Sequence, residues 1–233
     1  MNKSVLFIFD IDNTLLESYD IYDEAYRLTS KEILGKEFIM TKNPDGSKDN
    51  KFSRLSNNEI LEKRIKQLRI KKINSDEFFS AFDKNAETLA NKLKAKLYPW
   101  IKEFLSKLSK NYELIILSSG TKKLQISVLK NNDLVKHFNI KDSLFLGDFN
   151  SKKEAIEHIF NKDKKKTTLI HVGDSPNDMK AIKEANLSCK KIAIGVTLCG
   201  FVNKKVLLES GADLVINEYN AKNLNSIKKL ILS

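Results

Sequence analysis

Four short apolar runs constrain the fold of this chain most, because each ends abruptly at polar, acidic or glycine residues. They are Val5–Phe9 before Asp10, Glu113–Leu117 before Ser118, Thr168–Val172 before Gly173–Asp174, and Lys191–Ile194 before Gly195. Nearly continuous apolar runs are typical of strands that are buried on both faces, as in parallel sheets. The runs therefore predict an open parallel sheet.

Helical patterns fall between these runs. Pro99–Lys110 and Thr121–Asn131 carry apolar residues at helical spacing. Helix starts are predicted by the capping-box pattern at Ser151 and by the Ser-Pro pair at Ser175, and Gly211 predicts a helix end. Alternating strands and helices indicate an α/β fold, a Rossmann-like parallel sheet with helices on both faces.

The segment 17–97 has a different pattern. No convincing strand appears in it, whereas Asp76–Leu97 has a strong amphipathic periodicity and Tyr22–Leu34 and Asn58–Leu68 have weaker ones. A polar, turn-rich stretch, residues 41–58, predicts a long loop between them. We therefore predict a core formed by residues 1–16 and 98–233, with an all-helical cap, residues 17–97, inserted after the first strand.

Composition narrows the classes of partner. The chain of 233 residues has a formal charge of +11, but its lysines are spread in short groups without interleaved aromatic residues. This distribution does not predict a nucleic acid polymer as a partner, although a positive field favours small anionic substrates. Oligomeric state is left open.

The chain also lacks the sequence marks of membrane insertion or secretion. No apolar stretch approaches the roughly 20 residues of a membrane span, and Asp10 interrupts the apolar start. We expect a cytoplasmic protein without membrane association. Cys189 and Cys199 form no Cys-x-x-Cys pair, so we expect two small buried residues rather than a disulfide framework or a zinc site.

Three chemically useful side chains follow different predicted strands: Asp10, Ser118 and Asp174. In an open α/β sheet, ligands bind at the carboxyl ends of the strands, so these side chains should meet at one edge. With Asp12, the carboxylates offer the oxygen ligands that Mg²⁺ prefers. One carboxylate could then attack phosphorus and another could transfer a proton. The alternative is that Asp10 and Asp12 are only turn and cap residues.

Other candidates have equally plain structural explanations. Ser118–Ser119–Gly120 could bind anionic oxygens or could form an ordinary turn. Lys152 lies at a predicted helix N-terminus, where anions are favoured, but could be an exposed lysine. Asp178 suits the first turn of its helix by charge alone. His171 lies inside an apolar run and is expected to be a core histidine.

Together these segments resemble one family. "FDIDNTLL" is similar to the Asp-x-Asp-x-Thr first motif of haloacid dehalogenase-like (HAD) phosphatases, and "LIILSSG", "SKKEAIEHI" and "HVGDSPNDMKAIKEAN" resemble their second, lysine and acidic motifs, in the same order. "AIGVTLCGFVNKKVLLESGADLVI" resembles the closing segment of phosphoglycolate phosphatase-like members. The resemblance spans nearly the whole chain apart from the insertion.

The resemblance implies a role for each motif residue. Asp10 would be the nucleophile, and Asp12 the general acid and base. Asp10, the carbonyl of Asp12, and Asp174 would hold Mg²⁺.

The remaining motif residues would surround the phosphoryl group. Ser118 and the N–H of Ser119 would bind its oxygens, with Thr14 shaping the turn beside them. Lys152 would offset the negative charge, with Lys153 as the alternative. Asp178 would support the metal or orient the lysine.

The implied activity is Mg²⁺-dependent hydrolysis of a small phosphomonoester, of the phosphoglycolate, sugar phosphate or nucleoside monophosphate class. Asp12 argues against dehalogenase and phosphonate hydrolase chemistry, because those members lack the second aspartate. A phosphosugar mutase and a non-catalytic binding protein on the same fold remain alternatives. In the insertion, Lys51 and Arg54 are conceivable contacts for an acidic substrate, although exposed, solvated side chains are the favoured alternative.

Overall fold

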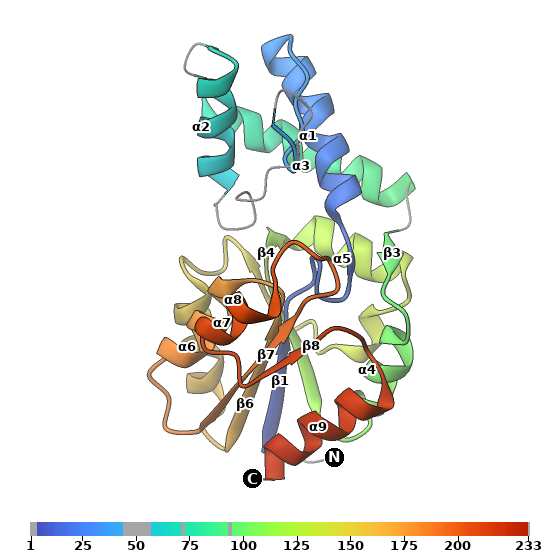
Figure 1. Cartoon of the computed structure of the whole chain (residues 1–233), viewed down its shortest axis with the longest axis vertical. Coiled ribbons are helices and arrows are strands. Elements are labelled where there is room, and N and C mark those ends of the chain that lie inside the picture. Colours follow the sequence, from blue (N-terminus) through green and yellow to red (C-terminus); the bar gives the residue numbers. More distant parts are fainter. Residues whose placement is uncertain (1–3, 44–56, 71–72, 93–94, 233) are drawn as a thin grey trace. The chain divides into compact units, whose positions relative to one another are not determined.

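A computed structural model describes residues 4–43, 57–70, 73–92 and 95–232 (Figure 1). The chain separates into two compact units, residues 1–17 with 96–233, and residues 18–95. Lys51 and Arg54, with most of the predicted loop, lie outside the described residues. Among the residues described, no helix is both long and apolar enough to cross a bilayer.

The larger unit is built on a six-stranded sheet in the order β5-β4-β1-β6-β7-β8. Its strands are β1 (Val5–Phe9), β4 (Glu113–Thr121), β5 (Leu144–Leu146), β6 (Thr168–Gly173), β7 (Lys190–Val196) and β8 (Leu214–Ile216). Every pairing between neighbouring strands is parallel. The predicted parallel sheet is confirmed, with β1 at its centre.

Helices cover both faces of this sheet (Figure 1). They are α4 (Ile101–Ser109), α5 (Lys122–Asn131), α6 (Lys152–Lys162), α7 (Pro176–Glu184), α8 (Lys204–Glu209) and α9 (Ala221–Leu232). Alternate residues of β1 point to opposite faces: Leu6 and Ile8 pack in the core formed with α6, α7 and α8. Phe9 packs against Phe138 on the other side. All five residues of β1 are buried, which explains its unbroken apolar run.

Local signals position the helices that border the carboxyl edge of the sheet. The Ser151 hydroxyl accepts a hydrogen bond from the N–H of Glu154 at 3.2 Å and begins α6 at Lys152. Ser175 and Asp178 form a reciprocal capping box at the start of α7, with Pro176 as its first residue. Gly211, at φ 103°, lies just beyond the end of α8, as predicted.

Strand β4 is longer than the sequence predicts. It continues through Ser118 and Gly120 to Thr121, because Thr121 pairs with Leu146 of β5 beyond a register irregularity. The expectation that Ser118 follows the strand is therefore wrong, because Ser118 lies within the C-terminal half of β4.

The smaller unit contains α1 (Tyr19–Leu34), α2 (Asn57–Gln67) and α3 (Ser75–Lys92). Tyr26 contacts Phe38, Phe78 and Phe82, so an aromatic cluster forms its core. These helices are close to the predicted ones, but α3 ends at Lys92.

The chain leaves the larger unit after Glu17 and returns to it at Lys96. The sequence did not predict that the segments at these two points form a strand pair. Leu16–Glu17 is β2, Lys96–Leu97 is β3, and the two pair antiparallel. The expectations of no strand in 17–97 and of a helix as far as Leu97 are wrong at this border. Leu97 continues the helical spacing, but its backbone pairs with Leu16 instead.

Candidate active site

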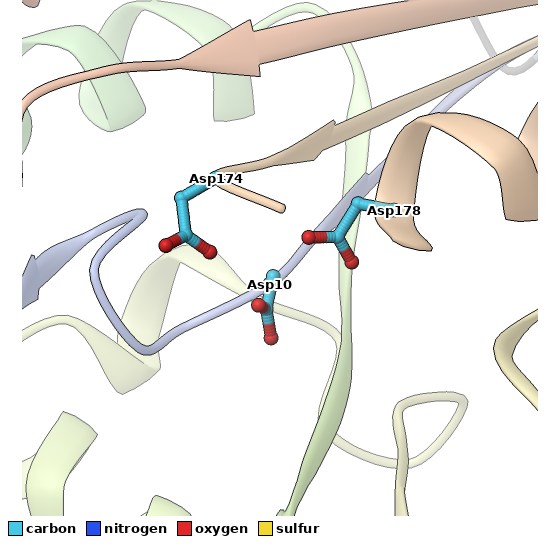
Figure 2. A group of neighbouring side chains, drawn as sticks. All are labelled: Asp10, Asp174 and Asp178. Atoms are coloured by element: carbon cyan, nitrogen blue, oxygen red, sulfur yellow. The ribbon is translucent and has the colours of Figure 1, made fainter. Parts of the chain in front are cut away.

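Two adjacent strands bring the central acidic residues together. Asp10 follows β1 and Asp174 follows β6, and the Asp10 N–H donates to the carbonyl of Val172 at 2.9 Å. Asp178 approaches from the first turn of α7, and the three side chains lie close together (Figure 2). One oxygen of each lies within 4.8 Å of the others.

The acidic cluster is buried, which changes its protonation. Asp10 is 8% exposed and Asp174 7% exposed. Burial raises the pKa of Asp10 to about 7, with Asp178 and Asp12 adding to the rise and Lys152 opposing it. Burial, with the charges of Asp178 and Asp10, also raises the pKa of Asp174 well above its ordinary value. This donor set of hard oxygens fits a divalent cation such as Mg²⁺, which favours the ionised carboxylates.

Lys152 lies inside this cluster. Its Nζ is 3.3 Å from Asp10 Oδ2 and 2.6 Å from Asp178 Oδ1, and its side chain is 13% exposed. Burial alone would lower the pKa of Lys152, but the charges of Asp10 and Asp178 raise it above its ordinary value. Lys153, the alternative, is exposed. Of the two lysines, the structure brings Lys152 to the acidic residues.

Asp178 is held by donors from the protein. Its Oδ2 accepts the N–H of Ser175 at 3.1 Å and the Ser175 hydroxyl at 2.6 Å, while Oδ1 accepts Lys152. Burial favours protonation, yet Lys152 and His171 hold the pKa of Asp178 below its ordinary range. A Cβ at Gly173 would overlap the Asp178 side chain, so this glycine provides the space for it. Asp178 therefore forms a 2.6 Å ion pair with Lys152 while its other oxygen is bound by Ser175.

His171 is fully buried in β6, as expected for a core histidine. Its Nδ1 lies 3.1 Å from the Ile8 carbonyl oxygen and its Nε2 lies 3.2 Å from Asp178 Oδ1. The ring thus links the backbone of β1 to the acidic cluster. The sequence alone did not indicate this contact, because it depends on which face of β6 the ring occupies.

A tight turn carries the next candidates. The carbonyl of Ile11 accepts hydrogen bonds from the N–H groups of Thr14 and Leu15, and Asn13 adopts a left-handed φ of 57°. The Thr14 hydroxyl is buried and has no hydrogen-bond partner within the described part of the chain. The Tyr219 hydroxyl donates to the Thr14 carbonyl at 2.6 Å. Tyr219, which sequence reasoning missed, thereby ties the C-terminal segment to this turn.

The serine pair divides into a buried and an exposed member. Ser118 is fully buried, and its Oγ accepts the N–H of Gly120 at 3.1 Å. Ser119 is exposed. Strand β4 pairs directly with β1, so Ser118 and Ser119 lie on the strand next to the one that Asp10 follows.

The cysteines differ from expectation. Cys189 and Cys199 are free thiols, and both are partly exposed rather than buried. The Cys199 thiol lies 3.7 Å from Asp174 Oδ2, and burial together with Asp174 raises its pKa to about 11. Cys199 therefore lies beside the acidic cluster as a protonated thiol.

Comparison with known families agrees with this architecture. Residues 5–186 match the model of the haloacid dehalogenase-like hydrolases. The match covers most of the chain and includes Asp10, Ser118, Lys152 and Asp174. The chain belongs to the haloacid dehalogenase-like hydrolase family. A search of curated proteins returned no significant match.

Solved structures with the same fold include a provisionally assigned β-phosphoglucomutase from Thermotoga maritima, at 22% identity and TM-score 0.67, covering 97% of this chain and 99% of that one. A predicted phosphoglycolate phosphatase from Haemophilus somnus is similar at 19% identity and TM-score 0.69, covering 97% of each chain. A provisionally assigned HAD hydrolase from Bacillus subtilis, bound to magnesium, is similar at 16% identity and TM-score 0.68, covering 98% of this chain and 100% of that one. At these identities the likeness establishes the fold.

Proposed function

We propose that this protein is a Mg²⁺-dependent phosphatase that hydrolyses a small phosphomonoester through an aspartyl phosphate on Asp10. The contact of Lys152 Nζ with Asp10 Oδ2, at 3.3 Å beside Asp174, supports this proposal most. It combines a carboxylate nucleophile with the positive charge that phosphoryl transfer requires.

The acidic residues take distinct roles in this proposal. Asp10 and Asp174, with the backbone carbonyl of Asp12, would hold Mg²⁺, which would offset the negative charge shared by the carboxylates and the phosphate. The Asp10 carboxylate attacks phosphorus, and Asp12 donates a proton to the departing oxygen. Asp12 then accepts a proton from the water that cleaves the aspartyl phosphate. The cycle returns both aspartates to their starting states.

The other residues stabilise the phosphoryl group. Lys152 pairs with its charge, and the Ser118 hydroxyl and the Ser119 N–H donate to its oxygens. Thr14 keeps the turn in place beside them. Residues 18–95 act as a cap that selects the alcohol part of the substrate, and the phosphoglycolate, sugar phosphate and nucleoside monophosphate classes are the candidates.

A screen of small phosphomonoesters with Mg²⁺, scored by kcat/KM, tests the proposal. On the best substrate, Asp10→Asn should lower kcat by about four orders of magnitude or more, because the nucleophile is lost. Asp133→Asn is the matched control, since the side chain of Asp133 is 71% exposed and belongs to no proposed role. Wild-type turnover by Asp10→Asn would refute the mechanism.

A phosphosugar mutase is the second candidate, because it would use the same aspartate pair on the fold of the Thermotoga maritima protein. Product analysis separates the two activities. Free phosphate supports hydrolysis, whereas an isomerised sugar phosphate supports the mutase. No reaction with any phosphoester would favour a non-catalytic binding protein.

A further inference from the structure

The buried amide of Gln125 contacts the proposed acid and base directly. Gln125 lies in the first turns of α5 and is fully buried. Its Nε2 donates to Asp12 Oδ2 at 2.6 Å, across 113 positions of sequence. An amide N–H is a donor only, so Oδ2 is the accepting oxygen of the Asp12 carboxyl.

Gly120 makes this contact possible. A Cβ at this position would overlap Gln125 Nε2 and would lie 2.9 Å from both Cγ and Cδ. The backbone of Gly120 does not require a left-handed φ, because it belongs to the extended end of β4. The absence of a side chain at Gly120 therefore leaves space for the Gln125 side chain. It is not required by the backbone conformation of Gly120.

The chemistry assigned to Asp12 requires a fixed carboxyl. The group must present a proton to the leaving oxygen and later accept one from water, and both transfers depend on hydrogen-bond geometry. A donor on Oδ2 fixes the rotation of the carboxyl about its Cβ–Cγ bond and leaves the transferred proton to Oδ1. A neutral amide achieves this without adding charge next to Asp10 and Asp174.

We infer that Gln125 is the positioning residue for Asp12, and that Gly120 is glycine so that Gln125 can reach it. This inference rests on the proposed function, because it assumes proton transfer by Asp12. If it is correct, the loss of rate that follows from removing the Gln125 amide depends on the leaving group of the substrate. An alkoxide must be protonated as it departs, whereas 4-nitrophenolate departs without a proton.

The first experiment measures single-turnover release of the alcohol from glycerol 2-phosphate and from 4-nitrophenyl phosphate. Gln125→Met keeps the volume and removes the donor, and Leu124→Met is the control at the buried neighbour on the same helix. Gln125→Met should slow alcohol release from the alkyl ester by about tenfold to a hundredfold, without a change in the half-saturating enzyme concentration. It should leave release from the aryl ester within about threefold. Equal losses on both esters, or no loss, would overturn the inference.

The second experiment tests the part assigned to Gly120. Gly120→Ala should produce the same leaving-group-dependent loss in the wild-type background and little further loss in Gln125→Ala. Additive losses would show that Gly120 acts independently of Gln125 and would overturn this part.

A crystal structure of Gln125→Met separates failure of this inference from failure of the proposed function. In comparison with a crystal structure of the wild-type protein determined in parallel, the Asp12 carboxyl should be displaced. An unmoved carboxyl contradicts the positioning role whether or not the protein hydrolyses any ester. Inactivity of the wild-type protein toward every ester contradicts the proposed function instead.

Discussion

Lys152 lies between two carboxylates of different character. Asp178 also accepts hydrogen bonds from Ser175 and His171, whereas burial raises the pKa of Asp10 to about 7. Asp178 therefore remains charged and binds the Lys152 ammonium. The ammonium in turn lowers the pKa of Asp10. The lysine therefore favours the ionised form of Asp10.

Replacing this lysine should affect rate and pH dependence together. Lys152→Met should lower kcat/KM by about 10²- to 10³-fold, as expected for the loss of one stabilising donor. It should also shift the acidic limb of the kcat/KM profile to higher pH, because the pKa of Asp10 rises when the cation is removed. Lys153→Met, at the exposed neighbouring position, should change neither quantity. An unshifted limb with an unchanged rate would contradict the role of Lys152.

The raised pKa values of Asp10 and Asp174 predict pH-dependent binding of Mg²⁺. Below about pH 7 the metal must displace a proton from Asp10, so the affinity should increase as the pH rises from 6 to 8. Calorimetric titration in buffers of different ionisation enthalpy would show proton release at pH 6. Asp10→Asn should reduce that release, and a pH-independent affinity would contradict the prediction.

The raised pKa of Asp10 also predicts how the stability of the metal-free protein changes with pH. A native pKa above the ordinary 3.8 means that the folded state binds the proton more tightly. This contribution is present at low pH and is lost as the pH rises from about 4 to about 7. Thermal unfolding of metal-free protein should show this trend, and Mg²⁺ should raise Tm more at pH 8 than at pH 6.

The sequence located the acidic residues better than their supporting contacts. Asp10 and Asp174 are evident because each interrupts an apolar run at a strand end. The partners of Asp12 and Thr14 are not, because Gln125 and Tyr219 lie 113 and 205 positions away. Such contacts depend on side-chain directions in the folded chain, which periodicity does not encode.

At the scale of elements, prediction succeeded where a strand or helix has a chemical boundary. Strand β1 was predicted to the residue because an acid follows five buried apolar residues. Strands β5 and β8 were missed because three residues are too few to show a pattern. Helix α3 was predicted too long because Leu97 fits its spacing although its backbone pairs in β3.

The N-cap of α6 should matter for both stability and activity. Ser151→Ala should lower the free energy of unfolding by about 1 kcal/mol, because the Glu154 N–H loses its acceptor. It should also lower kcat/KM by up to about tenfold, since Lys152 is the first residue of this helix. Denaturant unfolding and steady-state kinetics measure the two effects.

Helix α8 offers the matched control for this cap. Asn203 accepts the N–H of Val206 at 3.0 Å, and α8 carries no proposed site residue. Asn203→Ala should cost about the same stability and leave kcat/KM unchanged. Equal kinetic losses in the two variants would show that cap effects on activity are not specific to α6.

At the scale of the whole molecule, the pairing of β2 with β3 predicts that residues 18–95 can be deleted without unfolding the rest of the protein. Glu17 pairs with Lys96, so an Asn-Gly turn can join them as a two-residue hairpin. The shortened protein should fold, because the six-stranded sheet and its helices lie in the other unit. It should hydrolyse 4-nitrophenyl phosphate while losing discrimination among natural phosphomonoesters.

Circular dichroism, thermal unfolding and the phosphoester screen check this outcome. Insertion of the same Asn-Gly pair between Glu17 and Ser18 of the full chain controls for the added turn. An unfolded product would show that the larger unit depends on residues 18–95. Retained discrimination would show that these residues do not select the substrate.

The central place of β1 also bears on the order in which the protein is made. This strand is synthesised before both of its neighbours, which are residues 113–121 and 168–173. During synthesis, the apolar run of β1 therefore has no pairing partner while residues 18–95 emerge and form their own aromatic core. The nascent chain is thus exposed to aggregation through β1 until β4 and then β6 arrive. The acidic cluster, which needs β1, β6 and α7 together, is completed only after Asp178 has been synthesised.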